Sequence, residues 1–255
     1  MNTQNSEFLK KSLLNLGFGE KVNAELDKEM EAKTPEFRLG LSHEFNQKTV
    51  DYTLHFKAGD NQDMYFFNKY DAHIRHEDVA KEVSQTFFIN KGNGVTAKEA
   101  FNLMEGRSVH KQLTNLENQK YQAWLTLDDQ NLTESGNKKI KHYHENYGYD
   151  IEKVIAGKGI KELDDPKAKE DLYRSLKKGN AQQITVATGE GEKRYFIAAN
   201  PQFKTIDLYD HQMKKIKREE LLSTSAKATK SLKSRAQSSE ELPKKKQSRK
   251  SKMSV

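Results

Sequence analysis

Two segments of the sequence contain the same order of local signals, and this order constrains the fold class more than any other feature. In each segment a helix with one apolar side ends at Leu-x-x-Gly, and two runs of alternating apolar side chains follow. The helices are "TAKEAFNLMEG" at 96–106 and "DDPKAKEDLYRSLKKG" at 164–179. Helices combined with sequential hairpins are typical of α+β proteins. We therefore predict an α+β fold of small antiparallel sheets with packed helices.

The spacing inside the two segments raises the question of an internal repeat. Gly106 lies 15 residues before Tyr121, and Gly179 lies 16 residues before Tyr195. One interpretation is a duplicated module of helix, Leu-x-x-Gly turn and hairpin. The other is two ordinary helix-to-hairpin connections, because Leu-x-x-Gly is a common ending of an amphipathic helix that is capped by glycine.

The boundaries of both helices are predicted by their capping residues. Thr96 and Glu99 have the spacing of a capping box, in which each side chain satisfies a free N–H group of the first turn. Asp165 suits an N-cap, and proline suits the first turn that follows it. Gly106 and Gly179 stand where a left-handed residue ends a helix.

Helices and strands are also predicted in the first 95 residues. Residues 6–32 have helical spacing in two pieces, which are interrupted at "LGFG". "FRLGL", "VDYTLHF" and "MYFFNKYD" follow as strands, and a turn at "KAGDNQD" joins the last two. The aromatic run "MYFFNKYD" predicts a strand that is buried on both faces. We interpret residues 72–95 as a connection.

Charge is concentrated at the C-terminal end of the sequence. The predicted domains are 1–75, 76–150 and 151–222, followed by a tail at 223–255 with ten basic and two acidic residues, a net charge of +8. The tail has few apolar side chains, so we expect disorder. Clustered cations neutralise phosphates, which predicts non-specific DNA binding; the alternative is a solubilising tail. The predicted contacts are Lys227, Lys230, Lys233, Arg235, Lys244, Lys245, Lys246, Arg249, Lys250 and Lys252.

Further candidate contacts with nucleic acid lie in the folded part. Arg107, Lys111 and Lys204 stand next to the repeated turns, where they would touch phosphate or remain solvated charges. Trp124 and the aromatic residues of "MYFFNKY" would either stack on bases or form the core.

An enzymatic alternative depends on "HYH". His142 and His144 point to the same side of a strand and would share a metal ion, with Tyr147 or Tyr149 nearby, a pattern that resembles relaxase-type nucleases. The alternative is a purely structural role at the polar edge of a strand. The sequence has no phosphate-binding P-loop and no nucleophile elbow. We therefore assign no catalytic residue, no metal ligand and no cofactor.

The expected compartment follows from three absences in the sequence. There is no cysteine, which suits a reducing compartment. The N-terminal residues lack the pattern of a signal peptide, and no apolar run approaches the roughly 20 residues that span a bilayer. We expect a cytoplasmic protein that does not interact with membranes.

Six segments in order resemble a family of uncharacterised proteins of conjugative transposons and related mobile elements in bacteria of the Bacteroides group. They are "MYFFNKYDA", "TAKEAFNLMEGRSVHKQL", "YQAWLTLD", "HENYGYDIEKVI", "SLKKGNAQQITV" and "IAANPQFKTIDLYDHQMKKIKRE". The likeness covers roughly residues 8–218. It implies a module that carries the Leu-x-x-Gly pattern repeatedly. Some longer relatives are linked to type IA topoisomerase-like segments, and the family implies no catalytic residue.

Three classes of function are consistent with these observations. The favoured expectation is a non-enzymatic accessory protein of a mobile element, which binds DNA through the tail and a partner, such as a DNA-processing protein of the same element, through the folded modules. The second is an accessory subunit or fragment of a topoisomerase-like or relaxase-like enzyme. The third is a protein-interaction scaffold that does not bind nucleic acid.

Overall fold

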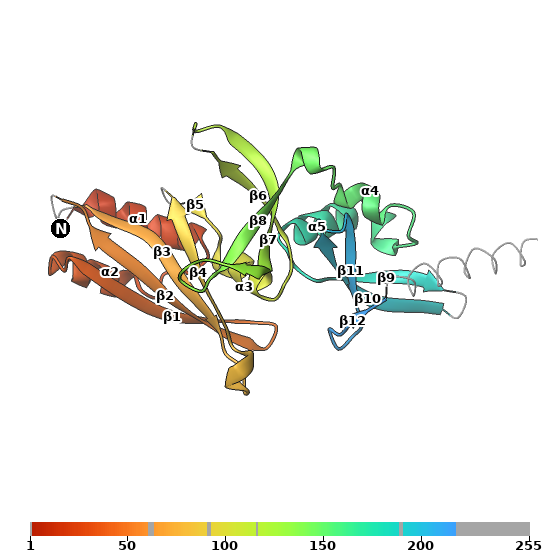
Figure 1. Cartoon of the computed structure of the whole chain (residues 1–255), viewed down its shortest axis with the longest axis horizontal. Coiled ribbons are helices and arrows are strands. Elements are labelled where there is room, and N and C mark those ends of the chain that lie inside the picture. The colour runs from red at the N-terminus through yellow and green to blue at the C-terminus, as the bar shows by residue number, and fades with distance from the viewer. Residues whose placement is uncertain (1, 61–63, 91–92, 116, 189–190, 218–255) are drawn as a thin grey trace, which may run out of the picture.

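A computed structural model describes residues 2–60, 64–90, 93–115, 117–188 and 191–217 (Figure 1). Within these ranges the chain forms five α-helices and three antiparallel sheets, and the predicted α+β class is confirmed. The predicted disorder of 223–255 concerns residues outside the described part. Among the described helices, none has the length and apolar character needed to cross a membrane.

The N-terminal unit is a five-stranded sheet in the order β1-β2-β3-β4-β5, with helices on one face. The predicted break at "LGFG" separates the two N-terminal helices. The elements are α1 (Thr3–Asn15), α2 (Asn23–Glu31), β1 (Glu36–Phe45), β2 (Lys48–Ala58), β3 (Tyr65–Ile74), β4 (Val83–Asn90) and β5 (Asn93–Gly94).

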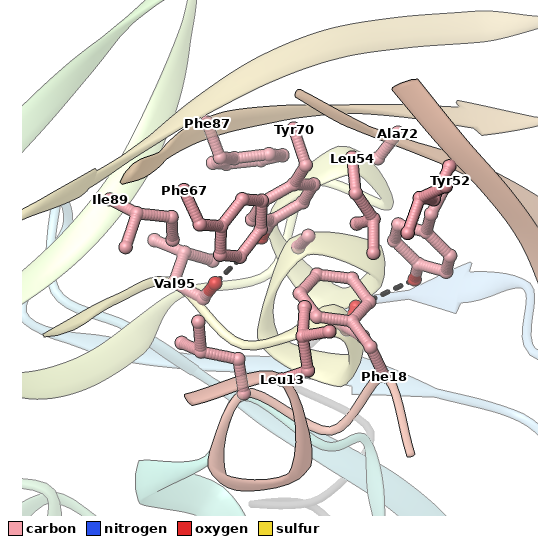
Figure 2. Close-up of a cluster of buried hydrophobic side chains, with 14 of the residues drawn as sticks. Leu13, Phe18, Tyr52, Leu54, Phe67, Tyr70, Ala72, Phe87, Ile89 and Val95 are labelled. Carbon is pink, nitrogen blue, oxygen red and sulfur yellow. Dashed lines mark hydrogen bonds between the residues drawn. The ribbon is translucent and has the colours of Figure 1, made fainter. Parts of the chain in front are cut away.

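The core of this unit lies between the sheet and the helices α1, α2 and α3 (Ala97–Met104). Phe18 is fully buried in it and makes edge-on contacts with the rings of Tyr52 and Tyr70 (Figure 2). The buried hydroxyls are satisfied, since Tyr52 donates to the carbonyl of Ala97 at 2.8 Å and Tyr70 to that of Val95 at 2.7 Å. These bonds tie the segment that leads into α3 to the middle of the sheet.

Two expectations for this unit were wrong. Strand β3 is buried on one face and exposed on the other, because Tyr65 and Phe67 point into the core while Phe66 between them is 47% exposed. The segment 72–95 is more than a connection, since it contains β4 and β5. The first sheet therefore continues past residue 75, where the first domain was predicted to end.

The second sheet is a three-stranded meander in the order β6-β7-β8, and it lies between the first unit and the C-terminal elements (Figure 1). Its strands are β6 (Val109–Thr114), β7 (Lys120–Leu132) and β8 (Lys138–His144). Adjacent residues of β7 enter different cores: Leu125 belongs to the first core, and Trp124 to a second core further along the chain. Because side chains alternate across a strand, one strand is shared between two hydrophobic cores.

The C-terminal unit has a four-stranded sheet in the order β12-β11-β10-β9. Its core contains Ile155 and Leu176 from the helices, and Ile184 and Ile197 from the strands. The elements are α4 (Ile151–Ile155), α5 (Pro166–Lys177), β9 (Gln182–Thr188), β10 (Gly191–Asn200), β11 (Thr205–Tyr209) and β12 (Lys215–Ile216).

Helix capping occurs as the sequence predicts. Thr96 and Glu99 make both bonds of the capping box at the start of α3. The side chain of Asp165 accepts a hydrogen bond from the N–H of Ala168 in the first turn of α5. Gly106 and Gly179 adopt left-handed φ angles of +76° and +80°.

Candidate nucleic-acid interface

The predicted nucleic-acid contacts fall into two groups. The ten basic residues of the tail lie outside the described residues. The structure places Arg107, Lys111 and Lys204, and each has its own set of partners.

Arg107 joins the ends of two helices. Its Nε donates to the carbonyl of Gly179 at 3.0 Å, and Nη2 donates to Oδ1 of Asn102 at 2.8 Å. The amide of Asn102 in turn donates to the carbonyl of Lys178 at 2.8 Å. Arg107 is 5% exposed, and burial lowers its pKa from the ordinary value. Its guanidinium therefore has a structural role, in place of the phosphate contact that the sequence suggested.

The other two candidates, Lys111 and Lys204, differ in their accessibility to solvent. Lys111 Nζ lies 2.6 Å from a carboxylate oxygen of Glu99, and the two side chains are 19% and 14% exposed. This ion pair links β6 to the capping box of α3. Lys204 is exposed in the turn between β10 and β11, with Nζ 4.5 Å from the centroid of the Tyr147 ring. Of the three, Lys204 alone is exposed to solvent, and its contact with phosphate stays a prediction.

Most of the aromatic candidates belong to the core. Trp124 is 5% exposed and packs edge-on against Tyr149. Tyr65, Phe67 and Tyr70 are also buried. For these four residues, the interpretation as core is the correct one.

The "HYH" residues form part of an aromatic cluster at one edge of the second sheet. The rings of His142 and His144 have centroids 6.3 Å apart, and Tyr121 stacks on His144 at 5.0 Å. Burial and the neighbouring His144 lower the pKa of His142. Within the part of the chain that the structure describes, no group of three or more His, Cys, Asp or Glu side chains is arranged to hold a metal ion.

A different aromatic surface lies on the face of the first sheet that points away from the helices, here called the open face. Phe88 on β4 is 74% exposed there, and it is the cross-strand partner of Lys69 on β3. Phe66 is likewise the partner of Lys57. On β2, the neighbour of β3 on its other side, His55 is the cross-strand partner of Lys69. Exposed aromatic rings next to cations are the groups that bind unpaired bases and their phosphates.

Acidic side chains on the open face are mostly neutralised by neighbours. Asp71 accepts hydrogen bonds from Nε2 of His55 at 2.6 Å and from the hydroxyl of Thr86 at 2.7 Å. Burial raises the pKa of Asp71, but the bonds from Thr86 and His55 together hold it below the ordinary value. Asp51 is paired with Arg75 at 2.5 Å.

Two basic side chains of the open face are free to contact a ligand. Arg38 and Lys69 make no salt bridge with any of the described residues, whereas Lys57 lies 2.6 Å from Glu36. Both side chains of that last pair are about two-thirds exposed, so the pair adds little stability and can exchange partners. The end of the open face near Phe88 is therefore aromatic and cationic.

Sequence reasoning missed this surface because 72–95 was interpreted as a connection. The signal was present in "TFFI", where Phe87 and Phe88 are adjacent and must point to opposite faces of a strand. Phe87 stacks on Tyr70 in the core, which directs Phe88 outward.

Comparison of the chain with protein-family models, characterised proteins and solved structures finds no match. The resemblance to mobile-element proteins therefore stays a prediction from the sequence.

Proposed function

We propose that this protein is a non-enzymatic, cytoplasmic accessory protein of a conjugative or related mobile element, which associates with DNA. In this proposal the basic tail supplies non-specific attraction to phosphates, and the open face binds unpaired bases. A DNA-processing protein of the same element is the proposed partner of the folded modules. The observation that carries the proposal is the exposure of Phe88 beside Lys69 on an uncovered sheet face.

The charge layout supports this division of labour. Residues 223–255 carry a net charge of +8, whereas the other 222 residues carry about −1. A tail of this kind would provide most of the affinity, and its contribution would fall steeply with salt because counterions are released on binding. A stacked base would add affinity that depends little on salt, since stacking on an aromatic ring involves no phosphate.

We also propose that the segments near 96–128 and near 166–210 are copies of one module. Both helices end with the same pair of bonds, from the glycine N–H to the carbonyl three residues earlier and from the next N–H to the carbonyl five residues earlier. In both, the side chain after the glycine donates back to the side chain five residues earlier: Arg107 to Asn102, and Asn180 to Ser175. Each helix is followed by sequential antiparallel strands.

The glycine ending alone is weak support for duplication, because α1 ends with the same bonds at Gly17. The stronger support is the combination of the cap, the returning side-chain bond and the meander. Of these, α1 has only the cap before α2 begins.

The experiment is a binding titration with two labelled DNAs, a mixed-sequence single strand and the matching duplex. Full-length protein, a 1–222 truncation, and a Phe88→Ala variant of each are compared between low and physiological salt. We expect the truncation to bind both DNAs more weakly and with a smaller salt slope. We expect Phe88→Ala to weaken single-strand binding by about 5-fold to 100-fold, equivalent to one stacked base, and to leave duplex binding unchanged.

Phe203→Ala is the matched control, since Phe203 is 67% exposed but lies in the C-terminal unit. If full-length protein and truncation both fail to bind at low salt, association with DNA is excluded. If Phe88→Ala and Phe203→Ala bind the single strand equally, the open face is not the contact.

A further inference from the structure

The first sheet opens at one end, between β3 and β4. The two strands are paired from Ile74 and Val83 as far as Lys69 and Phe88, but β3 continues to Tyr65 without β4 as its partner. At this end β4 pairs with the two residues of β5 instead. Helix α1 borders the opening, and a groove of about 520 Å³ lies between the helix and the two strands.

The groove is accessible and apolar. Phe8 and Leu9 of α1 line it together with Met64, Phe67 and Ile89. Phe8 is 52% exposed and Met64 is 43% exposed, so large apolar side chains face solvent at its mouth. Exposed apolar surface that is concentrated in one groove is characteristic of interaction sites.

The polar part of the lining consists largely of amide side chains, and among the residues that the structure describes none with a charged side chain lines the groove. The amides belong to Asn2, Gln4, Asn5, Asn68 and Asn90. An amide side chain both donates and accepts hydrogen bonds, as a peptide group does. Such a lining offers hydrogen bonds to a peptide backbone but no counter-charge to a phosphate, a carboxylate or an ammonium group.

Asn5 shows how these amides pair with a backbone. Its Nδ2 donates to the carbonyl of Tyr65 at 3.0 Å, and its Oδ1 accepts from the N–H of Tyr65 at 2.8 Å. A neighbouring antiparallel strand would make this same pair of bonds. Tyr65 lies beyond the last β3–β4 pair, so a side-chain amide stands where the peptide group of another strand would stand.

We propose that the groove binds an extended, uncharged peptide segment of a partner protein, with apolar side chains that enter between α1 and the strands. The peptide backbone lies along the groove and bonds with the amides of Gln4, Asn68 and Asn90, because the amides of Asn2 and Asn5 already bond within the chain. This inference deepens the partner-binding part of the proposed function and rests on it. It does not depend on the open face, although Phe66 borders both surfaces.

The uncharged character of the described lining makes charged ligands unsuitable occupants of the groove. A basic or acidic segment would lose hydration in the groove without gaining an opposite charge. The chain's own residues 223–255, with ten Lys or Arg, are therefore a poor fit. Nucleic acid is a poor fit for the same reason.

The test is a selection of ten-residue peptides displayed on phage against full-length protein, followed by titration of the most enriched synthetic peptide. We expect neutral peptides with apolar residues at alternate positions. Phe8→Glu places a charge in the mouth of the groove and removes a ring contact, so we expect a loss of affinity of about tenfold or more. Methylation of alternate backbone nitrogens in the peptide should weaken binding as well, because the donors to the rim are removed.

Met64→Lys is a second groove variant, and Phe203→Glu is the control on a distant exposed ring. Circular dichroism checks that each variant is folded, and the DNA titration is repeated on Phe8→Glu. Unchanged DNA binding together with lost peptide binding supports the two sites as separate.

Three outcomes would overturn the inference. One is enrichment that is equal for wild type and Phe8→Glu. Another is enrichment of charged peptides. The third is self-association in sedimentation that Phe8→Glu abolishes, which would make a second copy of this chain the occupant. Loss of DNA binding in all proteins would contradict the proposed function but not the groove.

Discussion

Gly106 and Gly179 have nearly the same left-handed φ angle but very different surroundings. A Cβ on Gly106 would meet nothing within 4 Å, whereas one on Gly179 would lie 2.8 Å from Val109 Cγ2, 2.9 Å from the carbonyl oxygen of Ser108 and 3.1 Å from Asn102 Cβ. The close approach exists because the end of α5 docks onto the end of α3. At Gly106 the conformation alone requires glycine, and at Gly179 the packing does as well.

Alanine substitution at the two glycines separates these requirements. We expect Gly106→Ala to lower the free energy of unfolding by about 1–2 kcal/mol, the cost of a left-handed alanine. Gly179→Ala adds the clash with the backbone of Ser108, for a total of about 2–5 kcal/mol. Urea denaturation measures both. Equal losses would show that the two helix ends are not in contact in solution.

The contribution of Asp128 to the stability of the fold depends on pH. Hydrogen bonds from Asn131, Lys141 and the N–H of Gln130 lower its pKa to about 2. An unfolded aspartate titrates near pH 3.9, so the carboxylate contributes its full stabilisation above about pH 5 and loses it progressively as the pH falls through about 4 toward about 2.

The prediction is a pH-dependent difference between wild type and Asp128→Asn. Wild type should exceed the variant in free energy of unfolding by a constant amount above about pH 5, and the excess should shrink between about pH 4 and pH 2. Urea titrations across this range measure it. Lys141→Met should raise the pKa of Asp128 in NMR titration. An excess that does not change with pH would contradict the assignment.

At the scale of elements, capping signals and alternation predicted most of the structure. The capping box of α3, the N-cap of α5 and the hairpin between β2 and β3 all form as expected, because each depends on neighbours within a few residues. Strand β4 was missed for two reasons. Its outward side chains include the apolar Phe88, and its edge is covered by residues that lie far away in the sequence. The N–H of Thr86 donates to Asn137 Oδ1 at 2.8 Å, a contact that local patterns do not contain.

The capping box of α3 also has a tertiary role that can be measured. Thr96 Oγ1 accepts a hydrogen bond from the N–H of Glu99 at 3.3 Å. The carboxylate of Glu99 accepts hydrogen bonds from the N–H of Thr96 and from Nζ of Lys111. We expect Thr96→Ala to cost about 1 kcal/mol and Thr96→Ser to cost little. Glu99→Gln should cost about 1.5–3 kcal/mol, because a partly buried lysine loses its charged acceptor. Thermal or urea unfolding compares the three, and a Glu99→Gln cost no larger than that of Thr96→Ala would contradict the role of Lys111.

At the scale of the whole molecule, the sequence predicted the α+β class but not the contacts between distant parts of the chain. Arg107 was expected either to contact phosphate or to remain a solvated charge, and the structure buries it instead. Its burial follows from Gly179, 72 residues away in the sequence, which supplies the acceptor. The groove was not predicted for a similar reason, since Asn5 and Tyr65 are brought together only by the packing of α1 on β3.

The sharing of β7 between two cores predicts that the described part of the chain unfolds as one unit. Leu125 is buried in the first core and Trp124, the one tryptophan of the sequence, in the second. Tryptophan fluorescence therefore reports on the second core, while far-UV circular dichroism reports on all sheets. We expect both signals to give the same midpoint in urea.

Leu125→Ala makes this prediction sharper, because it removes a side chain from the first core only. The loss should be about 2–5 kcal/mol, and the midpoint from Trp124 fluorescence should fall together with that from circular dichroism. Phe203→Ala, on an exposed ring, should move neither. If the fluorescence midpoint stays in place while the dichroism midpoint falls, the two cores unfold independently. The bonds of Arg107 and the continuity of β7 would then be too weak to couple them.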